Sequence, residues 1–266
     1  MRTGRTGTVV ALAGALALGA LAAPTAQAAD TGVTVTNMVV NGGKTIVVGP
    51  TEVKRPKFSF HVTLPGRLTL DDVDVIPFLY RYDTTPAGAW RSGGILPSGV
   101  GCGDAPSGGY NCSGDFSVDR STLDSNGDAA TWKFAVLAKV WSGDEFKTEE
   151  YLTGLGYERV KRSARVTVNA SPEPAVKGRP ITVTGKITRA DWALDRYVNY
   201  GGKQATLQFR KAGTTTYKAV RTVTANSTGD LRTTVTASYD GYWRWSAGGT
   251  ATTSGAGSTA DYVNVS

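Results

Sequence analysis

The segment QATLQFRK, residues 204–211, alternates polar and apolar side chains from Gln204 to Arg210, as a half-buried β-strand does. Its two expected faces carry Ala205, Leu207 and Phe209 on one side and Thr206, Gln208 and Arg210 on the other. Because successive side chains of a strand point to opposite faces, the pattern predicts an antiparallel sheet with one face in a core and the other in water.

The same alternation recurs on both sides of this segment, in RPITVTGKIT (179–188) and DLRTTVTAS (230–238). Short segments rich in Gly, Asn, Ser and Asp separate these runs and are typical of turns. Six or seven short strands within roughly a hundred residues favour an immunoglobulin-like β-sandwich. The inter-sheet cysteine pair of antibody domains is missing, so the core must hold without it.

The first half of the chain also reads as β structure. Its strand candidates are GVTVTNMVV (32–40), KTIVVG (44–49), KFSFHVTL (57–64), VIPFLYRY (75–82), DFSV (115–118) and TWKFAVLAKVW (131–141). A new β pattern starts near VKRSARVTVNASPEP (160–174). We therefore expect an all-β protein of two immunoglobulin-like antiparallel β-sandwich domains in tandem, residues 30–162 and 163–266.

Residues 1–29 have the three parts of a secretory signal. Arg2 and Arg5 precede an apolar run over residues 9–23, and Ala26-Gln27-Ala28 forms a cleavage site. The apolar run is too short to remain as a membrane anchor. The sequence predicts an exported protein, extracellular or associated with the cell wall, with no membrane attachment after cleavage.

The two cysteines, Cys102 and Cys112, lie in the loop-like stretch GCGDAPSGGYNCSG (101–114). In an exported protein, two thiols at this spacing are expected to form a disulfide. A two-cysteine metal site is the alternative, and it lacks histidines nearby.

Charge is distributed unevenly between the two predicted domains. Residues 30–162 hold 14 basic and 16 acidic side chains, a net charge of −2, whereas residues 163–266 hold 13 and 6, a net charge of +7. The basic second domain predicts contact with an anionic partner, such as an acidic cell-wall polymer or polysaccharide. The alternative is a basic but merely solvated face. Nucleic acid is not an expected partner, because an exported protein does not meet the DNA of its own cell.

The inventory of reactive side chains argues against an enzyme. His61 is the single histidine, and the alternation of KFSFHVTL places it on the solvent face. A Ser-His-Asp triad and the common catalytic zinc sites both need histidines in other settings. A glycosidase needs only paired carboxylates, but small sandwiches rarely offer the long cleft that glycan cleavage uses.

Calcium is the only cofactor that the sequence suggests. Asp124, Asn126 and Asp128 in LDSNGDAATW (123–132) have the alternating oxygen spacing of calcium loops. The pattern then fails, because an EF-hand requires other residues than Ala129 and Ala135 at the following ligand positions. The alternative is a plain hairpin turn in which Asn126 and Gly127 adopt positive φ.

Two aromatic-rich segments are candidate binding surfaces. In SYDGYWRWSAGG (238–249), strand alternation would bury Trp243 and Trp245 and expose Tyr242 and Arg244 to a sugar ring or an anionic polymer. The alternative for the exposed pair is a simple cross-strand contact. The second segment, ADWALDRYVNYGG (190–202), shows no strand alternation and reads as a loop, with Trp192, Tyr197 and Tyr200 as ligand-binding candidates.

Four stretches together resemble secreted actinobacterial proteins built from two immunoglobulin-like domains. They are VTNMVVNGGKTIVVG (35–49), VTVNASPEPAVKGRPITVTGKITRADW (166–192), LQFRKAGTTTYKAVRTVTANSTGDLRTTVTAS (207–238) and DGYWRWSAGGT (240–250). The resemblance implies the fold and export, and some such proteins carry a calcium-binding label without ligands that can be placed here. The combined expectation is a secreted, non-enzymatic binding or structural protein that associates with cell wall or extracellular polysaccharide, with extracellular calcium binding as the alternative.

Overall fold

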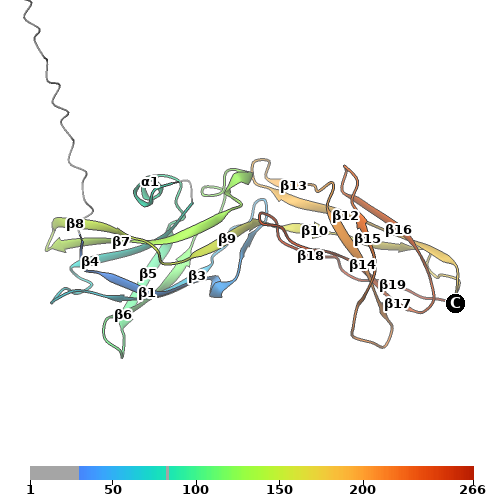
Figure 1. Ribbon diagram of the computed structural model, residues 1–266, viewed down its shortest axis with the longest axis horizontal. Coiled ribbons are helices and arrows are strands. Elements are labelled where there is room, and N and C mark those ends of the chain that lie inside the picture. Colours follow the sequence, from blue (N-terminus) through green and yellow to red (C-terminus); the bar gives the residue numbers. More distant parts are fainter. Residues whose placement is uncertain (1–29, 82–83) are drawn as a thin grey trace, which may run out of the picture.

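The computed structural model describes residues 30–81 and 84–266, so the predicted signal lies outside the described residues. Two β-sandwiches lie end to end along the long axis of the molecule (Figure 1). Strands β1–β9 build the two sheets of the first sandwich, and β10–β19 build the two sheets of the second. The prediction of an all-β protein with two antiparallel sandwiches is confirmed.

The first sandwich has the strand order of an immunoglobulin domain. One sheet runs β1 (Thr34–Val40), β3 (Lys57–Thr63), β6 (Tyr110–Phe116) and β5 (Pro97–Asp104). The other runs β2 (Ile46–Val48), β9 (Tyr157–Arg162), β7 (Thr131–Ser142) and β4 (Val73–Arg81), with β8 (Glu145–Leu152) also paired to β7. In immunoglobulin notation these sheets are A-B-E-D and A′-G-F-C.

The second sandwich is also immunoglobulin-like. Its first sheet holds β10 (Ala164–Val166), β11 (Asn169–Ser171), β12 (Pro180–Asp191), β13 (Arg196–Asn199) and β16 (Asp230–Thr236), all paired to β12. Its second sheet holds β15 (Lys218–Thr224), β14 (Gln204–Lys211), β17 (Gly241–Ala247), β18 (Ala256–Gly257) and β19 (Asp261–Val263). The topology is therefore A-B-E on one sheet and C′-C-F-G on the other.

The predicted faces form the two cores. In the first sandwich, the β7 face of Trp132, Phe134, Val136 and Ala138 is buried against the facing sheet. In the second, Ile181, Val183 and Ile187 of β12 pack with Ala205 and Leu207 of β14. A smaller cluster lies under the short helix α1 (Pro86–Arg91), where Phe78 and Leu137 contact Ala89. The 3-10 turns are η1 (Asn41–Gly43) and η2 (Asn126–Asp128).

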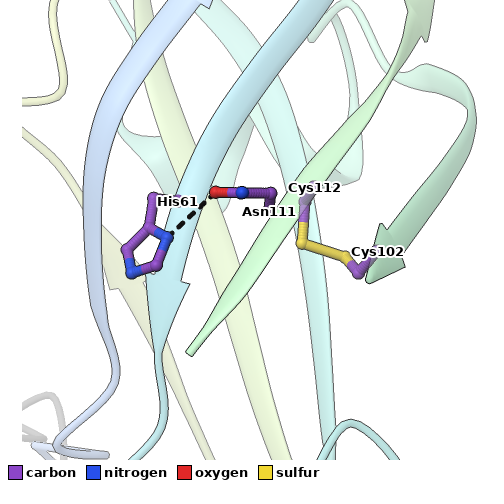
Figure 2. The surroundings of a disulfide bond; sticks show 4 residues. All are labelled: His61, Cys102, Asn111 and Cys112. Carbon is purple, nitrogen blue, oxygen red and sulfur yellow. Dashed lines mark hydrogen bonds between the residues drawn. A yellow bond between two sulfur atoms is a disulfide. The ribbon is translucent and has the colours of Figure 1, made fainter. Parts of the chain in front are cut away.

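The stretch around the cysteines is a β-hairpin, so the expectation of a loop is wrong. Cys102 of β5 lies directly opposite Cys112 of β6, and the two form the predicted disulfide (Figure 2). Most side chains of β5 are exposed on this edge strand. Apolar alternation was therefore not required there, and the sequence lacked the signal by which strands are recognised.

The only histidine lies near this hairpin. His61 of β3 is partly exposed, as expected, and its Nδ1 lies 3.0 Å from Asn111 Oδ1 on β6 (Figure 2). Its other ring nitrogen lies 3.5 Å from Thr63 Oγ1. Among the described residues, these amide and hydroxyl groups are the side-chain partners of His61, and they hold the ring without a carboxylate.

Candidate functional site

Strand β17 resolves the run Tyr242-Trp243-Arg244-Trp245 into two faces, as predicted. Trp243 is 5% exposed and Trp245 is fully buried, whereas Tyr242 and Arg244 lie partly exposed on the outer face. The indole Nε1 of Trp245 donates to Thr184 O at 3.0 Å on the facing sheet, which satisfies its polar atom within the core. The two tryptophans are therefore core residues.

The outer face of this sheet groups aromatic rings and guanidinium groups in register. Arg210 of β14 pairs with Tyr242 of β17, and Tyr242 pairs with Tyr262 of β19. Two residues further along the same pair of strands, Gln208 pairs with Arg244. With Tyr217, which lies just before β15, these side chains make up what we call the tyrosine–arginine face: Arg210, Tyr217, Tyr242, Arg244 and Tyr262.

The members of the tyrosine–arginine face stack on one another. Arg244 Cζ lies 3.7 Å from the ring centroid of Tyr217, and Arg210 Cζ lies 4.0 Å from that of Tyr242. The centroids of Tyr242 and Tyr262 are 5.0 Å apart. Arg244 Nε also donates to Gln208 Oε1 at 2.7 Å, and Arg210 Nη1 donates to Thr214 O at 2.6 Å. Stacking and hydrogen bonds together restrict the rotamers of both arginines.

Neither guanidinium is neutralised within the part of the chain that the structure describes. No carboxylate there lies within 4.0 Å of Arg210 or Arg244. The outward positions of β14 and β17 are Gln204, Thr206, Gln208, Arg210, Tyr242, Arg244 and Ser246, without an acid among them. Asp261, next to Tyr262, instead accepts a hydrogen bond from Ala170 N at 2.6 Å. The face therefore offers cations, hydroxyl groups and rings.

A shallow hollow lies beside one end of this face. Its volume is about 350 Å³, and Lys177, Lys211 and Tyr239 are among its lining residues. Lys211 Nζ lies 4.3 Å from the ring centroid of Tyr239, which is 54% exposed. Asp240 also lines the hollow, where its Oδ1 accepts a hydrogen bond from Val265 N at 2.7 Å. The hollow therefore combines two lysines and a tyrosine with one acidic residue.

The segment 190–202 does not form the predicted loop surface. It contains the end of β12 and all of β13, paired as a hairpin, so the expectation of a strandless connection is wrong. Trp192 is 1% exposed and packs in the core of the first sandwich, where its Nε1 donates to Gly49 O at 3.1 Å. It presents no surface to a ligand in this structure.

The two tyrosines of that segment, Tyr197 and Tyr200, pack against the cores of different sandwiches. Tyr197 packs against the first core and carries Arg165 Cζ at 3.8 Å over its ring. Tyr200 packs against the second core and carries Arg189 Cζ at 4.4 Å. The structure does not bring Trp192, Tyr197 and Tyr200 together with Tyr242 and Arg244. Whether either tyrosine contacts a ligand stays a prediction.

The segment with Asp124, Asn126 and Asp128 is a capped 3-10 turn. Asp128 is 5% exposed, lies 2.6 Å from Arg81 Nη1, and accepts a hydrogen bond from Ser125 N at 2.9 Å. Asn126 Oδ1 accepts from Trp192 N at 3.1 Å. The alternative of a hairpin loop is wrong, because neither Asn126 nor Gly127 adopts positive φ. In the described residues no group of three or more His, Cys, Asp or Glu side chains is placed to hold a metal ion.

Sequence reasoning missed three members of the tyrosine–arginine face. The alternation of 204–210 places Arg210 on the solvent-exposed face of its strand, and this is the only signal for it in the sequence. Its contact with Tyr242 depends on the register of β14 against β17, which one sequence does not reveal. Tyr217 and Tyr262 come from a loop and a three-residue strand, where alternation is too short to read.

No protein-family model and no curated protein matches the sequence, so the resemblance to secreted actinobacterial proteins stays a prediction. Among solved structures, a bacterial ice-binding adhesin is similar at 13% identity and a TM-score of 0.29, over 88% of this chain and 64% of that chain. The D00–D0 domain of intimin is similar at 13% identity and 0.26, over 85% and 99%. Titin domains A168–A170 follow at 12% identity and 0.25, over 88% and 68%.

These scores are too low to support an inference about function, and the immunoglobulin-like assignment rests on the strand order of the two sandwiches. Over residues 30–81 and 84–266, the chain has no helix of the length and apolar character needed to span a membrane.

Proposed function

We propose that this protein is a secreted, non-enzymatic binding protein that holds an anionic cell-wall polymer or acidic polysaccharide on its tyrosine–arginine face. The observation that carries the proposal is the pair Arg210 and Arg244, stacked on tyrosine rings and without a carboxylate partner among the described residues. Guanidinium groups recognise phosphate and carboxylate oxygens through paired hydrogen bonds. Because stacking already fixes both groups, little side-chain entropy is lost when a ligand binds.

The shape of this surface favours a polymer over a small molecule. Small-molecule sites are usually concave and bury most of the ligand. The tyrosine–arginine face is instead an open sheet surface across β14, β17 and β19, with its side chains in rungs. A chain of sugars or polyol phosphates can lie across several rungs, place rings on tyrosines and direct charged groups to the arginines.

Charge supports an anionic ligand. The net charge of +7 over residues 163–266 lies in the same sandwich as the tyrosine–arginine face, whereas residues 30–162 have a net charge of −2. A field of one sign raises the local concentration of an oppositely charged polymer and is screened by salt. The proposed attachment therefore weakens as ionic strength rises.

Export is supported by two features. Residues 1–29 match the pattern of a secretory signal. The disulfide between Cys102 and Cys112 is of a kind that persists mainly outside the cytosol. An exported protein would encounter a cell-wall polymer outside the cell.

The test is co-sedimentation of the purified chain with cell-wall sacculi at low and high salt. The whole chain should be used, because a fragment that begins at residue 163 would expose Trp192, which packs in the first sandwich. We expect the wild-type protein to sediment at low salt and to be released at high salt. The Arg210→Gln/Arg244→Gln double variant should stay in the supernatant at both.

Arg232→Gln is the matched control, because Arg232 is an exposed arginine on β16, in the other sheet of the same sandwich. It removes a positive charge and leaves the tyrosine–arginine face intact. Equal loss of binding in a single Arg232→Gln and a single Arg244→Gln variant would mean that net charge, rather than the proposed face, causes the attachment. Wild-type binding by the double variant would overturn the site.

A further inference from the structure

The two sandwiches meet where β9 ends and β10 begins. Arg162 N donates to Thr252 O at 3.0 Å, and Ser254 N donates to Arg162 O at 2.9 Å. The connection between β17 and β18 thus runs alongside the end of β9, and Arg162 and Thr253 form an isolated parallel β-bridge. Paired residues of adjacent strands direct their side chains to the same side.

This junction contains all the buried polar side-chain atoms without a hydrogen-bond partner in residues 30–81 and 84–266. They are Arg162 Nε, Arg189 Nε and Thr253 Oγ1. Arg162 is 7% exposed and Thr253 is fully buried. Buried polar groups nearly always have partners, because an unpaired one loses its hydration without compensation. Three such atoms at one place indicate a site that takes a ligand.

Arg189 belongs to the same site. It pairs with Ala164, two residues after Arg162, and its guanidinium stacks on Tyr200 at 4.4 Å. Burial lowers the pKa of Arg162, the charge of Arg189 lowers it further, and Asp191 and Tyr200 act in the opposite direction. In the described part of the chain, no carboxylate lies within 4.0 Å of either guanidinium. Two like charges thus lie close together, and neither forms an ion pair with a carboxylate of the described residues.

We propose that Arg162, Arg189 and Thr253, the junction cluster, bind a small oxyanion with two negative charges, for which inorganic phosphate and sulfate are the probes. Guanidinium forks and a hydroxyl group supply donors that match tetrahedral oxygens. A water molecule would satisfy hydrogen bonds but would add no negative charge beside the two guanidinium groups, neither of which forms an ion pair among the described residues. The complete burial of Thr253 limits the ligand to a small group, and the partly exposed Arg189 marks the side from which it enters.

Binding at this place would couple the two sandwiches. Arg162 ends the last strand of the first, whereas Arg189 and Thr253 belong to the second. A ligand shared by both stabilises the docked arrangement over any state in which the sandwiches separate. The inference is independent of the tyrosine–arginine face.

The experiment is thermal unfolding of the full chain while sulfate or phosphate replaces chloride, up to about 10 mM and at constant ionic strength, where salt exclusion is weak. We expect a saturable rise in Tm of about 2–4 °C. Arg162→Gln and Arg189→Gln should each remove most of the rise. Arg232→Gln, at an exposed position of β16, should keep it.

Arg189→Gln alone decides the question if Arg162→Gln does not fold, because Arg189 is only partly buried. No rise in the wild-type protein would overturn the site. A rise that is linear in sulfate and equal in Arg189→Gln would also overturn it, since that behaviour belongs to general salt exclusion.

Discussion

Two aromatic-rich segments of the second sandwich, residues 190–202 and 238–249, have similar composition and different positions in the structure. In the segment 238–249, strand β17 directs Trp243 and Trp245 into the core of the second sandwich and leaves Tyr242 and Arg244 on the outer face. In the segment 190–202, Trp192 follows the end of β12 and packs in the core of the first sandwich. One segment supplies a surface and the other supplies an anchor between domains.

The difference follows from how far each strand extends. Strand β12 has 12 residues: Ile187 still packs in the second core, whereas Ala190 belongs to the first. The strand thus serves two cores along its length. Alternation predicts which side chains share a face, but it does not predict which of the two sandwiches packs against that face. Aromatic content alone therefore does not identify a binding surface.

The largest effect is expected for Trp192→Ala. Removal of a fully buried indole from the junction should lower the free energy of unfolding by about 3–5 kcal/mol, because the transfer free energy is lost and a cavity remains. Urea denaturation followed by far-UV circular dichroism measures it. The control is Leu194→Ala in the same hairpin, at 54% exposure, with an expected change near zero. Similar small losses in both would show that the indole does not hold the sandwiches together.

The second prediction concerns how closely the core around Trp245 is packed. A Cβ atom at Gly185 would lie 2.7 Å from Trp245 Cδ1 and 2.4 Å from Thr167 O. Gly185→Ala should therefore destabilise the second sandwich by about 1–3 kcal/mol through overpacking. Gly248→Ala is the control, because a Cβ there meets no atom within 4 Å and the backbone φ is ordinary. A neutral Gly185→Ala would mean that β12 can shift away from β17 without loss.

The sequence predicted which face of a strand is buried better than it predicted which side chains of different strands contact one another. The alternation of β7, β12, β14 and β17 predicted most of the side chains that these strands bury in the two cores, because one face of each strand is apolar along most of its length. It did not predict the burial of Ala135 and Leu137 on the opposite face of β7. The site candidates Tyr242 and Arg244 followed from the same pattern. Arg210, Tyr217 and Tyr262 were missed, since their contacts with this pair depend on strand register and on a loop. The role of Trp192 depends on docking between domains, for which the sequence carries no periodic signal.

A smaller effect is expected for Asp128→Asn in the capped turn. The change removes the charge that faces Arg81 at 2.6 Å while keeping a side-chain oxygen for the donors of Ser125. We expect a loss of about 1–2 kcal/mol in the free energy of unfolding. Asp124→Asn is the control at a nearby carboxylate. Equal effects in both variants would contradict a specific role for the contact with Arg81.

A comparison of the wild-type protein with Asp128→Asn also tests the calcium hypothesis. If Asp124, Asn126 and Asp128 hold a metal ion, millimolar calcium raises the Tm of the wild-type protein and not that of Asp128→Asn. If Asp128 serves only as the partner of Arg81 and as a cap, calcium leaves both Tm values unchanged. Each outcome assigns the turn to one of the two hypotheses.

The smallest effect on stability is expected for Arg244→Gln. Its guanidinium lies on the outer face of β17 and contacts Tyr217 and Gln208, which are themselves partly exposed. Loss of one exposed stacking contact should change the free energy of unfolding by no more than about 1 kcal/mol. Sacculus binding at low salt should nevertheless fall several-fold, because the variant removes one of the two guanidinium groups of the tyrosine–arginine face, neither of which has a carboxylate within 4.0 Å among the described residues. A variant that loses stability and binding in proportion would indicate that Arg244 supports the fold. That result would contradict the assignment of residues 238–249 as a binding surface.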